Sequence, residues 1–202
     1  MLLIKSKYKI AKRLGAAIFE KTQSQKFALS EARTKKPQRR GGGSDYGRQL
    51  LEKQRVRFTY GLSERQLSNY AEAAFEEKDP TGALHKALEM RADSAVYRAG
   101  LSSTRRAARQ AVSHGHITIN GTRITTPSYK VKKGDSISVR EGSKGSPLFA
   151  GLAEAKEEAA RAVPNWLSVD LALLKAQVTG EPLYNPMETG LDYATVFEFY
   201  SR

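Results

Sequence analysis

The chain has 202 residues, of which 40% are hydrophobic and 27% charged, a composition that fits one or two folded domains. Lysine and arginine outnumber aspartate and glutamate by 34 to 21, and the net charge of +13 favours a polyanionic partner, either nucleic acid or an anionic membrane surface. The chain has no cysteine, which excludes disulfides, thiolate zinc sites and a cysteine nucleophile; no apolar run approaches the ~20 residues that span a bilayer, so we expect a soluble, intracellular chain with no membrane partner.

Positive charge is concentrated in two blocks of the sequence. Residues 1–40 carry 12 basic and 2 acidic side chains, and residues 91–140 carry 10 and 2. Residues 67–90 have a net charge of −3, and residues 141–202 a net charge of −4. A solvated arm with chance clustering of charge is the alternative, but it would not need this segregation. We therefore interpret the two blocks as phosphate-contacting surfaces.

Residues 1–43 are predicted to form an extended basic arm. Basic side chains interrupt nearly every apolar patch, and three glycines close the segment at 41–43. Apolar residues that recur at helical spacing allow a short helix around residues 10–20. Because like charges repel, we expect the arm to be disordered when free and to order only against a polyanion.

Residues 44–90 are predicted to be helical. Ser44 is a typical N-cap, and the helix that follows it should end at Gly61. The C-terminal residues 186–202 contain several large apolar side chains that need partners. We expect this tail to pack on the helices of residues 44–90.

The next helix begins at a capping box formed by Ser63 and Gln66. Its apolar residues recur at a spacing of three and four, and we expect Tyr70 and Phe75, which lie on this stripe, to be in the core. Residues 79–82 are predicted to form a turn before a further helix.

Residues 91–140 change the pattern to short helices and strands. Helices are predicted at residues 93–99 and 104–114, and Ser102 and Ser103 offer N-caps for the second helix. Its small apolar residues would let two helices approach closely.

A β-hairpin is predicted at Asn120 and Gly121, because a type I′ turn needs positive φ at both positions. A two-residue loop would pair Ile117 with Ile124. A third strand is expected at residues 137–139. Beyond it we expect a link and an Ala/Glu-rich helix before residue 164, two paired apolar segments at residues 166–171 and 173–178, and a loop at residues 181–190.

An enzymatic function is weakly supported. The three histidines are His85, His114 and His116, and no carboxylate cluster joins the last two to complete a metal site. The sequence also lacks paired carboxylates in an apolar setting and a Walker-type glycine loop. We therefore expect no enzyme, no metal, no cofactor and no small-molecule substrate.

Nucleic-acid binding is better supported. Arg105 and Arg109 are four residues apart and so share a helix face, with Arg106 alongside. The backbone amides at residues 103–105 could hold a phosphate. The loop at residues 113–116 could hydrogen-bond phosphate or ribose, or stack on a base. Lys130, Lys132 and Lys133 would lie near the edge of the sheet.

RNA is the preferred partner on physical grounds. The sequence predicts no long recognition helix and gives no sign of a dimer. A short helix pair with a hairpin suits the irregular surface of folded RNA better than the regular groove of DNA.

Several motifs resemble the S-four family of small-subunit ribosomal proteins and the RNA-binding module named after it. In chain order, the matching stretches are residues 44–50 (SDYGRQL), 52–57 (EKQRVR), 60–66 (YGLSERQ), 91–98 (RADSAVYR), 103–105, 108–110, 112–114, 119–121 and 197–202 (FEFYSR). The resemblance covers residues 44–140 and the tail. It departs from the family at residues 37–41, where the family's usual Pro-Gly-Gln-His-Gly is missing, and at Ala92, where the family has leucine.

The resemblance implies a primary binder of the five-prime domain of small-subunit rRNA. Such a protein acts early in subunit assembly, lies where mRNA enters the subunit, and contributes to decoding accuracy. Its other partners would be neighbouring small-subunit ribosomal proteins, and it would be a monomer within a cytoplasmic or organellar ribosome. Some relatives bind zinc through arm cysteines, which this chain lacks, so no zinc is implied.

The elements and the resemblance together predict an α+β fold. The expected parts are a basic N-terminal arm (1–43), a helical domain (44–90) closed by residues 186–202, and an inserted RNA-binding module (91–185). That module would have two short helices and a small antiparallel sheet, with a helical and strand extension.

The candidate rRNA-binding residues are the basic and polar side chains of these parts. They are Lys5, Lys7, Lys9, Lys12, Arg13, Arg39, Arg40, Ser44, Tyr46, Arg48, Gln49, Lys53, Arg55, Arg57, Arg65, Arg91, Arg98, Ser103, Thr104, Arg105, Arg106, Arg109, Ser113, His114, Lys130, Lys132 and Lys133.

Two alternatives share the same module. An RNA-modifying enzyme, such as a pseudouridine synthase, needs a large catalytic domain, and the 62 residues after residue 140 leave no room for one. A stand-alone RNA-binding protein that acts on stalled ribosomal particles would lack the helical segment 44–90 and the returning tail.

Overall fold

The computed structural model of the chain describes residues 4, 6–15, 18–33, 44–149, 152 and 162–201. The chain divides into two compact units. One, here the helical unit, comprises Met1–Leu84 and Asn185–Arg202, and the other, here the inserted unit, comprises His85–Tyr184. The junctions predicted from the sequence are 90/91 and 185/186.

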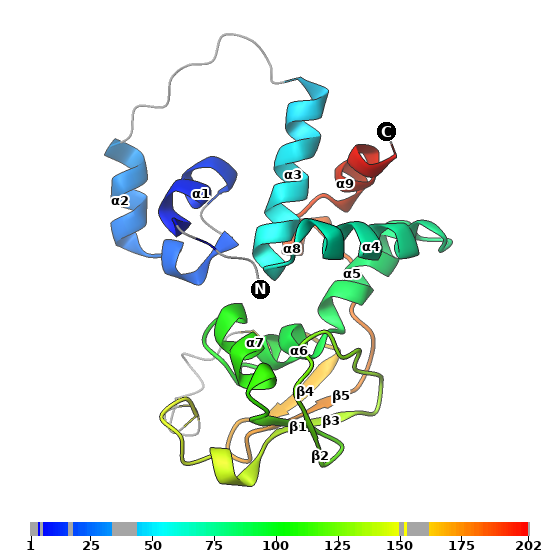
Figure 1. The fold of residues 1–202 in the computed structure, drawn as a ribbon. Coiled ribbons are helices and arrows are strands. Elements are labelled where there is room, and N and C mark those ends of the chain that lie inside the picture. The colour runs from blue at the N-terminus through cyan, green and yellow to red at the C-terminus, as the bar shows by residue number, and fades with distance from the viewer. Residues whose placement is uncertain are drawn as a thin grey trace. The chain divides into compact units, whose positions relative to one another are not determined.

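The fold is α+β, as predicted. The helical unit contains only helices among its described residues, and the inserted unit combines helices with a sheet (Figure 1). The helical unit is built from α1 (Lys7–Leu14), a 3-10 turn (Glu20–Thr22), α2 (Gln25–Arg33), α3 (Asp45–Tyr60), α4 (Glu64–Phe75), the start of α5 (Pro80–Glu89), α8 (Pro186–Thr189) and α9 (Tyr193–Tyr200).

The ends of α3 and the start of α4 are confirmed as predicted. The Ser44 side chain accepts a hydrogen bond from the backbone N–H of Gly47 at 3.1 Å, which caps α3. Gly61 ends the helix with a φ of 62°, a conformation that costs glycine little. Ser63 and Gln66 form the reciprocal capping box of α4.

The C-terminal helix α9 packs against α3 and α4, as expected of the tail. The buried hydroxyls of Tyr60 and Tyr193 lie 3.2 Å apart. The rings of Tyr46 and Phe199 are 5.8 Å apart, and those of Phe75 and Phe197 are 5.3 Å apart in an edge-to-face arrangement. These aromatic contacts join α3 and α4 to the C-terminal helix, so that segments on either side of the inserted unit in the sequence form one unit.

Three local predictions in this unit are wrong. Phe75 is not a core residue, because its side chain is 52% exposed at the last residue of α4. Residues 79–82 do not form a separate turn: Asp79 accepts hydrogen bonds from the Thr81 hydroxyl and the Gly82 amide, and so caps α5, which begins at Pro80. The predicted loop at residues 181–190 contains the short helix α8, capped by Asn185.

The expectation of an extended arm is also wrong for the described part of residues 1–43. Helices α1 and α2 enclose a small apolar cluster that contains Ala11, Leu14, Ile18, Phe19 and Phe27. Leu51 and Phe58 of α3 pack against this cluster. Burial of these side chains favours the packed arrangement and opposes the repulsion between the lysines around them. The glycine-rich stretch at residues 41–43 lies outside the described residues.

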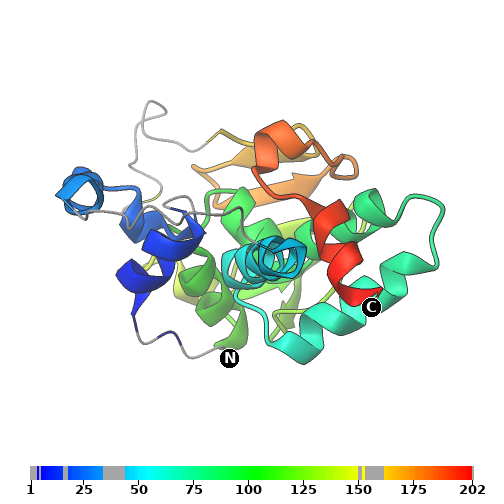
Figure 2. The same ribbon diagram turned by 90° about the horizontal axis from the view of Figure 1, so that it is seen from above.

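The inserted unit contains a five-stranded antiparallel sheet with helices over one face (Figures 1 and 2). The strand order is β2-β1-β3-β5-β4. The elements are the end of α5, α6 (Ala92–Arg98), α7 (Arg105–Ser113), β1 (Ile117–Ile119), β2 (Thr122–Ile124), β3 (Ser136–Val139), a 3-10 turn (Glu141–Ser143), β4 (Leu167–Asp170) and β5 (Lys175–Val178).

The hairpin and its register are confirmed. Asn120 and Gly121 have φ values of 51° and 79°, and Ile117 pairs with Ile124. The N-cap of α7 is Thr104 and not the predicted Ser102 or Ser103, and the Thr104 hydroxyl accepts a hydrogen bond from the amide of Ala107. Most of the predicted helix before residue 164 lies outside the described residues.

The core of this unit lies between the helices and the sheet. Ala108, Ala111 and Val112 present the small apolar face of α7 to Ile117 and Ile137, and all five are buried. No helix within the described ranges is long and apolar enough to span a membrane.

Candidate nucleic-acid interface

The arginines of α7 face in two directions. Arg109 Nε donates to Asp93 at 2.7 Å, and Arg105 Nη2 donates to Glu89 at 3.1 Å. Both arginine side chains are 15% exposed. Arg106, by contrast, is exposed, with no ion-pair partner among the described residues. The residue spacing correctly placed Arg105 and Arg109 on one face, and that face points toward carboxylates of the same unit.

Glu89 and Asp93 are the centres of this arrangement. Arg98 donates to both oxygens of Glu89 at 2.7 and 2.9 Å, and Arg91 does the same to Asp93 at 3.0 and 2.9 Å. The two carboxylates are buried. A buried carboxylate is stable only when it is paired and hydrogen-bonded, and here each has two guanidinium partners. We call these two carboxylates and four arginines the arginine–carboxylate cluster.

His85 lies beside this cluster in α5 and is buried. Burial lowers the pKa of His85 below its ordinary value of 6.5; the charge of Glu89 raises it, and those of Arg98 and Arg105 lower it further. The imidazole is therefore neutral at neutral pH.

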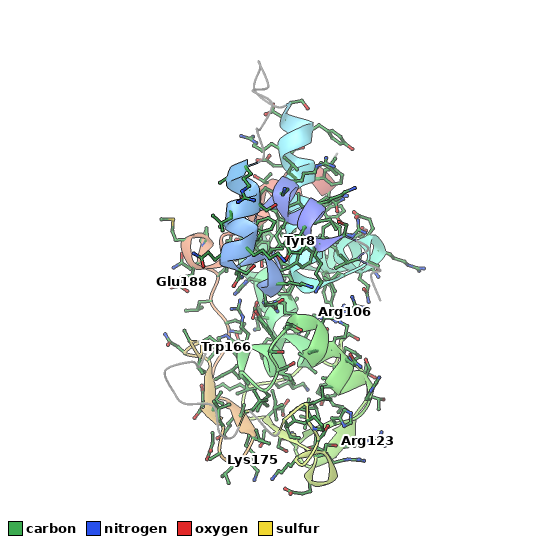
Figure 3. The ribbon with its side chains drawn as sticks, turned by 90° about the vertical axis from the view of Figure 1, so that its left-hand side faces the viewer. Tyr8, Arg106, Arg123, Trp166, Lys175 and Glu188 are labelled. Carbon is green, nitrogen blue, oxygen red and sulfur yellow. The ribbon has the colours of Figure 1, made fainter. Side chains whose placement is uncertain are left out.

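The outer face of α7 carries the polar side chains that remain accessible. Arg106, Gln110 and Ser113 follow helical spacing on α7, and Ser103 and His114 lie just before and just after the helix. All five are exposed. Figure 3 shows Arg106 and Arg123 projecting from the same side of the inserted unit, with Trp166 toward the other side. A face with one guanidinium, hydroxyls, an amide and an imidazole can bind phosphate and ribose.

The lysines at residues 130–133 are also accessible. Lys130, Lys132 and Lys133 are exposed, and their turn is fixed by Asp135, which accepts from the backbone N–H of Lys132 at 2.8 Å. Asp135 also accepts from Asn120 in the hairpin loop at 2.9 Å. Three exposed cations therefore lie on or just before an ordered turn.

Lys53 and Arg57 of α3 are engaged inside the helical unit. The buried ammonium of Lys53 donates to Glu64 at 2.6 Å and lies 4.1 Å from the ring centroid of Phe199. Arg57 also donates to Glu64, at 3.4 Å, as does the hydroxyl of Tyr200, at 3.0 Å. These charges join α3, α4 and α9.

The pKa of Glu64 reflects this network. Burial would raise the pKa of Glu64, but hydrogen bonds from Lys53 and Tyr200 and the charges of Lys53 and Arg57 outweigh burial and lower it below its ordinary 4.5. Burial also raises the pKa of Tyr200, and the charge of Glu64 adds to this effect.

Other candidates on α3 have structural contacts as well. Gln49 is buried and donates to Glu198 of α9 at 3.0 Å, and Arg55 donates to the carbonyl of Leu14 at 2.6 Å. Exposed candidates of this unit also include the N-cap and side chains near the helix starts. These are Ser44, Tyr46, Arg48 and Arg65.

The helices α1 and α2 add exposed cations. Lys9 and Arg13 of α1 are exposed, and Lys7 and Lys12 are partly buried. Lys26 and Arg33 of α2 are also exposed, although they were not among the candidates. Lys5, Arg39 and Arg40 lie outside the described residues.

Sequence reasoning missed Arg123. This residue follows the hairpin loop on β2, and its guanidinium donates to the backbone carbonyls of Gly115 and His114 at 3.2 and 3.1 Å. No local motif signals this contact, because it depends on the hairpin folding back against the end of α7. Within the described ranges there is no group of three or more metal-ligating side chains that could hold an ion.

Two family models match the chain. The "Ribosomal protein S4/S9 N-terminal domain" matches residues 3–90, and the "S4 domain" matches residues 90–137. The boundary between the two matches lies at the end of α5.

Proteins named "Small ribosomal subunit protein uS4" are similar along nearly the whole chain. The protein from Roseiflexus castenholzii is 42% identical over 197 residues, which cover 96% of each chain. The protein from Chromobacterium violaceum is 41% identical over 202 residues, covering 97% of each, and that from Limosilactobacillus fermentum is 44% identical over 166 residues, covering 81% of each.

Proposed function

The chain belongs to the ribosomal protein S4 family, and from this premise we propose that it binds the five-prime domain of small-subunit rRNA early in subunit assembly. The family is structural and not enzymatic, so the protein's role is that of an rRNA-binding constituent of the small ribosomal subunit. The proposal extends to its neighbours: other small-subunit ribosomal proteins, mRNA where it enters the subunit, and a contribution to decoding accuracy. We place the protein as a monomer in a cytoplasmic or organellar ribosome.

The observation that carries the proposal is the division of basic side chains between paired and accessible positions. The arginine–carboxylate cluster neutralises its own charge, whereas the outer face of α7 and the lysines at residues 130–133 are exposed and have no described carboxylate within ion-pair distance. Because the backbone of these elements is already ordered, phosphate binding by their accessible cations does not add the cost of ordering the backbone.

The proposed contact set is therefore narrower than the full group of candidates. It comprises the exposed members of that group in both units: Lys9, Arg13, Ser44, Tyr46, Arg48, Arg65, Ser103, Arg106, Ser113, His114, Lys130, Lys132 and Lys133. The buried Lys53 and Arg91 are not in this set, because each forms an ion pair inside its own unit.

Footprinting of the full chain on naked small-subunit rRNA tests the proposal. We expect a saturable complex with a ~nanomolar dissociation constant, with protection confined to one rRNA domain. With ~6–10 phosphate contacts, affinity should fall by roughly 10³–10⁵ between 50 and 200 mM salt. Equal binding to unrelated RNA of the same length would overturn the proposal.

A stand-alone binder of stalled ribosomal particles is less well supported. Such a protein would lack the helical unit, whereas here α9 returns to pack on α3 and the relatives match the chain over both units.

A further inference from the structure

Arg123 makes a bridge between the hairpin and the end of α7. It stands on β2 opposite Thr118 of β1. Its Nε donates to the carbonyl of Gly115 at 3.2 Å and its Nη2 to the carbonyl of His114 at 3.1 Å. One planar guanidinium therefore holds two successive carbonyls of the loop between α7 and β1.

The backbone amides at the end of α7 bond to carbonyls earlier in the helix and not to those of His114 and Gly115. The amide of Gly115 donates to Val112 at 2.8 Å and that of His116 to Ala111 at 3.0 Å, which satisfies the carbonyls one turn earlier. The carbonyls of His114 and Gly115 lie beyond the last residue of the helix. A cation is favoured at this end, where the partial charge of the helix is negative.

Gly115 is suited to this contact for two reasons. Its φ is 71°, a backbone conformation that residues other than glycine rarely adopt, and a Cβ at this position would overlap the guanidinium of Arg123. The close approach of Arg123 to the loop backbone thus depends on the absence of a side chain at residue 115.

The loop held by Arg123 presents two polar side chains outward. Ser113 and His114 are exposed. On the inner side, His116 is partly buried and its Nδ1 lies 2.9 Å from the hydroxyl of Ser143. Arg123 and Ser143 therefore hold the loop from two directions while Ser113 and His114 remain available to a ligand.

We propose that Arg123 is a positioning residue that fixes the α7–β1 loop so that Ser113 and His114 can contact rRNA. The inference rests on the proposed function, because it assigns the backbone support of one proposed contact surface. Arg123 acts through the two carbonyls and not through a contact of its own with phosphate. Loss of the guanidinium leaves two carbonyls without their donor and lets the loop adopt other conformations.

A double-mutant cycle in the full chain tests this role. Arg123→Ala should weaken binding of small-subunit rRNA about tenfold, and the same change in a His114→Ala background should have an effect below about threefold, because the loop then has little left to position. The salt dependence should stay within about half a unit of the wild-type slope, since no phosphate contact is lost. Arg123→Lys should not restore binding, because an ammonium cannot hold both carbonyls in a planar fork.

Two controls separate positioning from other effects. Lys175→Ala removes an exposed cation from β5 of the same sheet and should leave affinity within about twofold of wild type. Hydrogen exchange at the amides of Gly115 and His116 in the free Arg123→Ala chain should accelerate about tenfold while exchange in β1 and β3 is unchanged.

The outcomes distinguish this inference from the proposed function. Two results would overturn the positioning role alone, provided that the wild-type chain selects small-subunit rRNA. One is that the losses of rRNA affinity in Arg123→Ala and His114→Ala are additive in the double variant, and the other is that the salt dependence of rRNA binding falls by a full unit in Arg123→Ala. Unchanged exchange at Gly115 and His116 does the same. A wild-type chain that fails to select small-subunit rRNA overturns both.

Discussion

Positive side chains are placed differently in two regions of the molecule: several are exposed on α1 and α2, whereas four arginines in the region of α5 to α7 are paired with buried carboxylates. In α1 and α2, cations surround a small apolar cluster and several are exposed, among them Lys9, Arg13, Lys26 and Arg33. In α5 to α7, four arginines of the strongly basic block 91–140 converge on two buried carboxylates, Asp93 of the same block and Glu89 of the acidic block before it. The comparison teaches that the formal charge of a segment is not the charge that a ligand can reach.

The reason lies in the cost of burying ions. A guanidinium that leaves water must gain a carboxylate in good geometry, and a carboxylate that leaves water needs its own donors. Short helices rich in alanine approach closely enough for Arg105 and Arg109 to reach acids on α5 and α6. The apolar cluster beneath α1 and α2 contains few buried residues, and Lys9 and Lys26 of these helices stay exposed to solvent.

Removal of Glu89 should give the largest effect on stability. Glu89→Ala leaves Arg98 and Arg105 without their shared carboxylate in a buried setting. We expect a loss of about 3–5 kcal/mol in the free energy of unfolding, measured by urea denaturation. The matched variant Glu77→Ala, at an exposed acid just beyond α4, should change it by less than about 0.5 kcal/mol. Equal effects of the two variants would refute a structural role for the cluster.

Neutralising the exposed cations of α1 and α2 should produce the opposite pattern. The combined variant Lys9→Ala, Arg13→Ala, Lys26→Ala and Arg33→Ala should flatten the salt dependence of rRNA binding by up to about 3–4 units, since each lost phosphate contact removes roughly one. Urea denaturation should show little change beyond about 0.5 kcal/mol per site, because all four side chains are exposed. An unchanged slope would show that these helices do not contact rRNA.

The arginines of α7 sharpen the comparison within a single helix. Arg106→Ala should lower the slope of the salt dependence of rRNA binding by about one unit without changing the free energy of unfolding. Arg109→Ala, which breaks the 2.7 Å contact to Asp93, should lower the free energy of unfolding by about 1–3 kcal/mol and leave the slope unchanged. If Arg109→Ala alone flattens the slope, then Arg109 exchanges Asp93 for phosphate in the complex.

Local signals allowed much of the fold to be predicted from the sequence. Ser44, the capping box at Ser63 and the Asn120–Gly121 hairpin each depend on residues within a few positions of one another, and all three were confirmed. The apolar cluster of α1 and α2 was missed because it depends on Leu51 and Phe58 of another helix. Charge repulsion is visible in the sequence, but the burial that offsets it is not.

The candidate site was predicted less completely for the same reason. Helical spacing places Arg105 and Arg109 on one face, but it does not show which way that face points. The carboxylate that pairs with each arginine lies 16 residues earlier in the chain. Arg123 was missed because its partners are backbone carbonyls, which leave no trace in a sequence pattern.

The smallest expected effect is a difference between the two units in how acid lowers stability, through His85 in the inserted unit and Glu64 in the helical unit. Because the pKa of buried His85 is lowered from 6.5, the unfolded chain binds its proton first, so stability is present above pH 6.5 and is lost as pH falls through that value toward the folded-state pKa. The pKa of Glu64 is lowered from 4.5, so its contribution to stability persists until pH falls below 4.5.

Between pH 7.5 and 5.5, urea denaturation should therefore show a decline in stability that is reduced in His85→Gln and unaltered in Glu64→Gln. Below pH 4.5, Glu64→Gln should lose less stability than the wild type on further acidification, because the carboxylate that must be protonated is gone. A Glu64→Gln chain that already differs in pH dependence above pH 5.5 would contradict the assignment of the two groups to separate pH ranges.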